Sequence, residues 1–201
     1  MSEQHQMRSV AMVLFAMALL VTAVVSLFVI GGEDINPDTE HVGGDFTLQS
    51  SSGSVSLKQF RGKAVLLFFG YTHCPDVCPT TMSNLSETLD LLSEREREKV
   101  QPLFITVDPL RDSVEHLAKY VAFFHPKIIG LSGTTDEIKS VAQKYTVEYF
   151  KDGEESEADK YLISHTSYLF LINPEGEVSD LMSDHTSPAD IADALRQYIS
   201  R

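Results

Sequence analysis

The chain has 201 residues, of which 43% are hydrophobic and 22% charged, and it contains no tryptophan. This balance is ordinary for a globular protein and excludes a disordered chain. The formal net charge is -13, and because nucleic-acid binding needs clustered Lys and Arg, we exclude a nucleic-acid partner. Residues 1–30 contain only Glu3 and Arg8 as charged residues, so this acidity lies on residues 31–201.

An uncharged apolar run occupies the 21 residues from 10 to 30. A helix rises about 1.5 Å per residue, so the run is long enough to cross a hydrocarbon core of about 30 Å. A cleaved signal peptide is the alternative, but its apolar region is usually about 7–15 residues long and ends in a small-x-small site. We therefore expect an uncleaved transmembrane helix, with residues 1–9 in the cytoplasm because Arg8 precedes the span.

This orientation places the rest of the chain outside the cytoplasm. The nine residues before the span include Glu3, which argues against an Arg-rich organelle transit peptide. We expect a single-pass protein of a bacterial inner membrane with its C-terminal domain in the periplasm. Residues 31–44 contain two Gly pairs, Pro37 and several acids, a composition typical of a linker to a domain over residues 45–201.

Hydrophobic patterns predict the elements of that domain. Residues 64–69 and 103–107 are predominantly apolar, as expected for strands that are buried on both faces. Between these two strands, apolar residues recur at helical spacing and predict one helix over residues 79–97. Two expected hairpins pair residues 45–48 with 55–57 and 168–172 with 178–182, and residues 128–131 are expected to form another short strand. Residues 147–150 and 161–163 are expected to form a protruding hairpin or loop.

Capping signals predict the later helices. Asp112 with Glu115, and Thr134 with Glu137, resemble capping boxes that open two helices. Ser187, which a proline follows, is expected to cap the last helix. Strands and helices that alternate and then end in an antiparallel hairpin and a helix predict an α/β fold. We expect a thioredoxin-like mixed sheet flanked by helices.

Cys74 and Cys78 are the only cysteines, and they directly follow the strand expected at residues 64–69. The carboxyl end of a strand is where an α/β sheet presents ligands. Pro79 is suited to open a helix and disfavours a helical conformation at Cys78. We therefore place Cys78 near an N-cap, where the helix dipole lowers the pKa of a thiol. A structural disulfide or two buried thiols is the alternative, although so short a loop would stabilise the domain little.

The spacing of the two cysteines favours a metal without excluding a disulfide. Redox pairs of the thioredoxin type use Cys-x-x-Cys, whereas three residues separate Cys74 from Cys78. Disulfide sulfurs lie about 2.05 Å apart, and two thiolates on one metal lie about 4 Å apart. The loop with three residues between the cysteines allows the larger separation of the sulfurs that a metal requires.

A histidine is the best candidate for a third ligand. His165 lies just before the strand expected at residues 168–172, a position that faces the cysteine loop in a thioredoxin-like sheet and is commonly held by a cis-proline. His73 precedes Cys74, but adjacent side chains of an extended segment point to opposite faces. Two thiolates and one imidazole suit Cu(I), and Cu(II) when a further ligand or water completes the site. Structural zinc usually takes four protein ligands, and we expect Asp76 to serve the turn rather than supply a fourth.

Three separated motifs, over residues 70–79, 107–112 and 165–176, read GYTHCPDVCP, VDPLRD and HTSYLFLINPEG. In this order they resemble the Sco/SenC family, and the resemblance extends from about residue 45 to residue 198. It implies a thioredoxin-like fold and a role in assembling the dinuclear copper centre of cytochrome c oxidase. The implied partners are the copper-accepting oxidase subunit and a thiol reductant or another copper chaperone.

The resemblance also implies that Cys74, Cys78 and His165 bind copper. Many members have an acid immediately before the ligand histidine, whereas this chain has Ser164. In the motif at residues 107–112, Asp108 and Arg111 are expected to hold the loop.

Two functions remain open at this point. The first is a metallochaperone without catalytic turnover, and the second is a thiol-disulfide oxidoreductase that reduces the cysteines of the oxidase copper site through Cys74 or Cys78. A peroxidase is disfavoured because Tyr71 lies where such enzymes carry a threonine, three residues before the reactive cysteine. Acidic residues between 152 and 159 are expected to form a solvated turn, with steering of a basic partner as the alternative.

Overall fold

The computed structural model describes residue 17, residues 42–152 and residues 161–199. The chain divides into two units, Met1–Glu40 and His41–Arg201, and all the described residues except Met17 belong to the second. Within the described part, no helix is long and apolar enough to cross a membrane. The anchor predicted at residues 10–30 lies outside these residues apart from Met17, so the anchor and the linker after it stay predictions.

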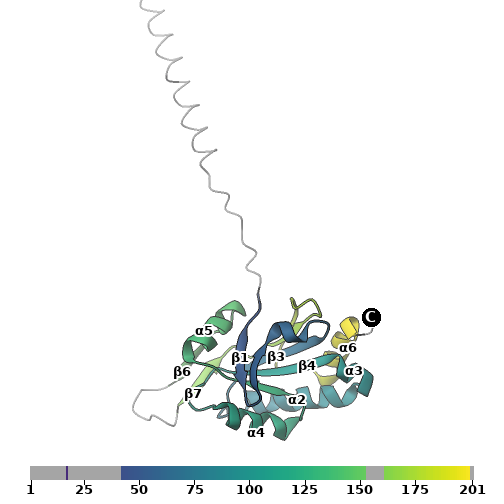
Figure 1. Cartoon of the computed structure of the whole chain (residues 1–201), viewed down its shortest axis with the longest axis horizontal. Helices are drawn as coiled ribbons and strands as arrows, with labels where there is room; N and C mark the ends of the chain where they lie inside the picture. Colours follow the sequence, from purple (N-terminus) through teal and green to yellow (C-terminus); the bar gives the residue numbers. More distant parts are fainter. Residues whose placement is uncertain (1–16, 18–41, 153–160, 200–201) are drawn as a thin grey trace, which may run out of the picture. The chain divides into compact units, whose positions relative to one another are not determined.

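A five-stranded mixed sheet with strand order β5-β4-β3-β8-β9 forms the centre of the domain. Its strands β3 and β4 lie side by side in Figure 1. β3 pairs in parallel with β4 on one side and antiparallel with β8 on the other. Every residue of β3 and β4 is buried, which explains why both strands read as apolar runs. The sheet consists of β3 (Ala64–Gly70), β4 (Val100–Thr106), β5 (Ile129–Leu131), β8 (Leu169–Ile172) and β9 (Val178–Met182).

The helices pack around this sheet, and α2 contacts both α4 and α6 (Figure 1). The central sheet with its helices confirms the predicted thioredoxin-like α/β fold. The helices are the 3-10 helix η1 (Leu57–Phe60), α2 (Val77–Leu91), α3 (Glu94–Glu98), α4 (Val114–Phe124), α5 (Thr135–Lys144) and α6 (Pro188–Ile199).

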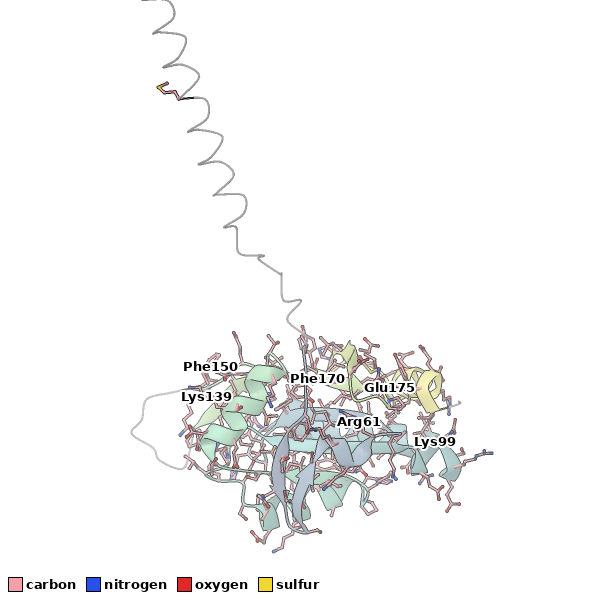
Figure 2. All side chains as sticks on the ribbon, turned by 45° about the horizontal axis from the view of Figure 1, so that its top comes forward. Arg61, Lys99, Lys139, Phe150, Phe170 and Glu175 are labelled. Carbon is pink, nitrogen blue, oxygen red and sulfur yellow. The ribbon has the colours of Figure 1, made fainter. Side chains whose placement is uncertain are left out.

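Two antiparallel hairpins lie outside the central sheet. β1 (Thr47–Ser50) pairs with β2 (Gly53–Ser56), and β6 (Tyr149–Asp152) pairs with β7 (Leu162–His165). We call the second hairpin the β6–β7 ribbon. The side chain of Phe150 is 63% exposed, and it lines a groove together with Lys139 of α5 (Figure 2). Because side chains alternate along a strand, Phe150 and its partner Ser164 lie on the opposite face of the ribbon from His165.

The prediction of one helix over residues 79–97 is wrong, because the structure has two helices there. Buried Leu92 adopts an extended conformation with φ -86° and ψ 139°. The next residue, Ser93, starts α3 with a capping box in which Glu96 N–H donates to its hydroxyl and Ser93 N–H donates to the Glu96 carboxylate at 2.8 Å. A cap of this kind begins a new helix, and apolar spacing alone does not reveal it.

The capping box predicted from Asp112 and Glu115 is also wrong. The N-cap of α4 is Ser113, whose hydroxyl accepts a hydrogen bond from His116 N–H at 3.2 Å. Asp112 is fully buried and binds groups elsewhere in the fold. Asp112 lies one residue before the N-cap, Ser113, and its position in the sequence therefore resembled that of a cap.

The other two predicted helix starts are confirmed. Thr134 and Glu137 form a capping box at the start of α5, in which Thr134 N–H donates to the Glu137 carboxylate at 2.7 Å. The hydroxyl of Ser187 accepts from Asp190 N–H at 3.2 Å at the start of α6. Each cap satisfies a backbone donor that a helix leaves without an intrahelical partner.

Candidate metal centre

The structure brings Cys74, Cys78 and His165 together. One ligand atom from each of the three side chains lies within 4.8 Å of the others. The Sγ atom of Cys78 is 3.4 Å from Nε2 of His165, although 87 residues separate them in sequence. In the described ranges these residues form the one group of at least three His, Cys, Asp or Glu side chains that converge as metal ligands do.

The two cysteines follow the carboxyl end of β3 and Cys78 lies near the N-cap of α2, as predicted, but Cys78 is itself helical, which Pro79 was expected to disfavour. α2 begins at Val77 with Asp76 as its N-cap, so Cys78 lies inside the first turn. Pro79 is therefore the third helical residue. Proline is tolerated there because backbone N–H groups of the first turn have no intrahelical acceptor.

A close approach of backbone and sulfur positions Cys78 against β3. A Cβ atom at Gly70 would lie 2.8 Å from the Cys78 sulfur and 3.0–3.1 Å from the rings of Phe68 and Phe104. A residue with a side chain at this position would displace the ligand or its neighbours. The glycine at the end of the strand thus leaves room for the buried sulfur of Cys78.

The thiol with the lowered pKa is Cys74, not Cys78. A hydrogen bond from the Cys78 thiol, together with the Cys78 N–H at 3.4 Å, lowers the pKa of Cys74 to about 3 against the opposing effect of burial. Because the Cys78 thiol donates to Cys74 and is buried, the pKa of Cys78 is raised above its usual range. The predicted lowering of the Cys78 pKa is therefore wrong, and the N-terminus of α2 favours a thiolate only at the sulfur outside the helix, through the Cys78 N–H.

His165 presents Nε2 to the two sulfurs. Nδ1 lies 3.0 Å from the carbonyl oxygen of Thr166, and a carbonyl can only accept, so Nδ1 carries the proton. This leaves the lone pair on Nε2, which faces Cys78. The rings of Phe68 and Tyr71 pack edge-on against the imidazole, with centroid distances of 6.2 and 5.9 Å. His165 ends β7 of the ribbon rather than directly preceding β8, but it faces the cysteine loop as predicted.

Sequence reasoning missed the role of Asp112 in holding the cysteine loop. Its carboxylate accepts from the backbone N–H of Thr72 at 3.0 Å and from the Thr72 hydroxyl at 2.6 Å. It also accepts from the hydroxyl of Thr106, at the end of β4, at 2.7 Å. Thr72 lies two residues before Cys74, so Asp112 ties the loop to the central sheet. The position of Asp112 in the VDPLRD motif was the available signal.

Other predicted residues surround the centre without joining it. The ring of His73 stacks on His116, with centroids 6.1 Å apart, and its Nδ1 is 3.1 Å from the Thr72 hydroxyl. Asp76 is the N-cap residue of α2, but its side chain makes no capping hydrogen bond. Ser164 donates to the carboxylate of Asp152 at 2.5 Å across the ribbon.

Asp108 and Arg111 hold the loop between β4 and α4, as predicted. Arg111 Nε donates to the Asp108 carboxylate, and the loop reaches the segment before β7 because Arg111 Nη1 donates to the carbonyl of Tyr161 at 3.0 Å. The loop therefore contacts the part of the chain that carries His165.

The SCO1/SenC family model matches residues 35–200 of this chain. The chain belongs to the SCO1/SenC family. Among SCO1/SenC relatives, the mitochondrial SCO2 homolog of Bos taurus is 41% identical over 159 residues, which are 78% of this chain and 59% of the bovine protein. The chain thus spans less than two thirds of that relative.

Solved SCO1/SenC structures share the fold. Arabidopsis thaliana ScoI with copper bound is 38% identical with a TM-score of 0.70, and the match covers 79% of this chain and 98% of the plant one. Bradyrhizobium japonicum ScoI with copper bound is 36% identical with a TM-score of 0.71, covering 78% and 99% of the two chains. The match to the family model over residues 35–200 includes the cysteine loop and His165.

Proposed function

We propose that this chain is a copper-binding metallochaperone whose ligands are Cys74, Cys78 and His165. The observation that carries the proposal is the convergence of two sulfurs and one imidazole nitrogen within 4.8 Å. Thiolates are soft ligands that select Cu(I), and an added imidazole also suits Cu(II) when another ligand completes the site. Copper-bound structures of family members support the choice of copper.

The cargo of such a site would pass to a protein that offers similar ligands. Cys78 is buried, whereas Cys74 is partly exposed, so an incoming ligand can approach from the side of Cys74. The resemblance of the three motifs to the Sco/SenC family supports the copper-accepting subunit of cytochrome c oxidase as the recipient. A thiol reductant or another copper chaperone would keep the cysteines reduced or supply the metal.

A titration of the purified full-length chain with copper under anaerobic conditions tests the ligand set. Wild type is expected to bind one equivalent, and His165→Ala is expected to bind Cu(II) more weakly and with altered optical and EPR spectra. His185→Ala is the matched control, since the His185 side chain is 91% exposed. An unchanged stoichiometry, affinity and spectrum for His165→Ala would show that the ligand assignment is wrong.

The lowered pKa of Cys74 supports a second candidate, a thiol-disulfide oxidoreductase. In that reaction the Cys74 thiolate attacks a target disulfide and releases one target thiol. Cys78 then displaces the second, so that a Cys74–Cys78 disulfide forms as the target gains two electrons and two protons. Reduction of a disulfide substrate at the wild-type rate by His165→Ala, a variant expected to bind copper more weakly, would favour this function over the chaperone.

The proposal includes anchoring by residues 10–30 in a bacterial inner membrane, with the domain in the periplasm. The uncharged run and the position of Arg8 before it support this topology. A reporter enzyme that is active only in the periplasm, fused after residue 201, is expected to be active. Activity of the matching fusion to a reporter that works only in the cytoplasm would contradict the topology.

A further inference from the structure

The β6–β7 ribbon needs contacts of its own to place His165, because it is separate from the five-stranded sheet that positions the cysteines. One contact is the hydroxyl of Tyr71, which accepts a hydrogen bond from Ile163 N–H at 3.1 Å. This contact holds the middle of β7. The start of β7 is held by the residue directly before it, Tyr161.

Tyr161 is bound on several sides at once. The guanidinium carbon of Arg111 lies 3.6 Å from the centroid of its ring, and the ammonium of Lys151 lies 4.1 Å from the same centroid. Both cations are attracted to the electron-rich faces of the ring. The hydroxyl of Tyr161 donates to the Asp108 carboxylate at 2.7 Å, and its carbonyl accepts from Arg111.

These contacts connect the ribbon to a rigid part of the domain. The side chains of Asp108 and Arg111 are only 2% and 12% exposed, and both belong to the loop that follows β4. That loop also contains Asp112, which holds the cysteine loop through Thr72. This loop therefore contacts both halves of the metal centre, the cysteine loop and the β6–β7 ribbon that carries His165.

Strand geometry transmits the position of Tyr161 to the ligand. Side chains alternate along a strand, so Tyr161, Ile163 and His165 share one face of β7. Ile163 is buried on that face, and Lys151 lies opposite it in the register of the ribbon. A rotation or shift of the strand at Tyr161 would therefore move the imidazole relative to Cys78.

We propose that Tyr161 is the positioning residue for His165, and that its contacts with Arg111, Lys151 and Asp108 set the ribbon so that Nε2 faces the sulfur of Cys78. The inference rests on the proposed function for the identity of the metal, but the positioning itself is a property of the metal-free chain. Two thiolates are enough to bind Cu(I), whereas the affinity for Cu(II) depends more on the imidazole ligand. Loss of Tyr161 should therefore weaken Cu(II) binding while one equivalent of Cu(I) still binds.

The test compares Tyr161→Leu with Tyr161→Phe in the full-length chain, each with wild-type His165 and with His165→Ala. Loss of a group that orients a metal ligand typically costs about 10–100-fold in affinity, and we expect that loss of Cu(II) affinity for Tyr161→Leu. Its Cu(II) EPR spectrum should approach that of His165→Ala. Tyr161→Phe keeps the ring between the two cations and loses one hydrogen bond, so its loss should be about three- to tenfold.

A thermodynamic cycle separates positioning from general damage to the fold. If Tyr161 acts through His165, then Tyr161→Leu causes no further loss of Cu(II) affinity in the His165→Ala chain. Tyr168→Leu is the matched control, because Tyr168 is 48% exposed and lies as close to His165 in sequence. Equal losses in both backgrounds, or an unchanged Cu(II) spectrum for Tyr161→Leu, would overturn the proposal.

Hydrogen exchange of the metal-free chain gives a second measurement. Amides of residues 162–165 should exchange faster in Tyr161→Leu than in wild type or Tyr168→Leu, and unchanged exchange would overturn the proposal. If wild type bound no copper, the proposed function would fail while this measurement still decided the positioning. If Tyr161→Leu did not fold, Tyr161→Phe would carry the test, and unchanged affinity and exchange in that variant would count against the proposal.

Discussion

Cys78→Ser is expected to remove tight copper binding and to leave the domain folded. The Cys78 sulfur is buried and lies 3.4 Å from His165 Nε2. A serine hydroxyl is a hard oxygen donor that is poorly suited to Cu(I). Because a group that only supports a ligand is worth about 10–100-fold in metal affinity, loss of a ligand itself should exceed about 100-fold. A competition titration with a Cu(I) chelator measures the change.

The fold should tolerate this substitution because serine is nearly isosteric with cysteine, and its hydroxyl can donate to Nε2 of His165. His73→Ala is the matched control. His73 is the neighbour of Cys74 in sequence, but its ring lies against Thr72 and His116. The control should keep wild-type affinity. Retention of wild-type Cu(I) affinity by Cys78→Ser would remove the sulfur from the ligand set.

Asp112→Ala is expected to lower the free energy of unfolding by about 3–9 kcal/mol, because three donors lose their acceptor at about 1–3 kcal/mol each. These donors are the backbone N–H and the hydroxyl of Thr72 and the hydroxyl of Thr106, at 3.0, 2.6 and 2.7 Å from the carboxylate. Asp112 is fully buried, so water cannot readily replace it. Chemical denaturation followed by circular dichroism measures the loss. Copper affinity should fall as well, since Thr72 leads into the loop that carries Cys74.

The matched control for Asp112→Ala is Glu115→Ala, three residues later in the first turn of α4. Glu115 is exposed, and surface substitutions away from special features usually change stability by about 0.5 kcal/mol or less. If both variants lost the same small amount of stability, Asp112 would have no special role in holding the cysteine loop.

Much of the fold could be predicted from local pattern. β3 reads as an apolar run because both of its faces are buried, and the cap of α5 is visible as Thr134 with Glu137. The predictions failed where two signals overlapped within a few residues. Ser93 separates the amphipathic pattern of residues 82–92 from the charged run of residues 94–99, and Ser113 adjoins an acid that resembled the cap. Neither spacing nor composition shows which of two adjacent candidates takes the backbone hydrogen bond.

The sequence by itself determined which residues can hold a metal. Cys74 and Cys78 follow a buried strand, and burial and strand direction are encoded in neighbouring residues. Only the tertiary structure decided which sulfur is the thiolate, because that depends on the direction of the Cys78 N–H and thiol. It also decided how His165 reaches Cys78 from a separate ribbon, and how Asp112 and Tyr161 hold the two halves in place. The physical reason is that the contacts of His165, Asp112 and Tyr161 join residues tens of positions apart, and no local pattern in the sequence encodes distances or hydrogen-bond directions between them.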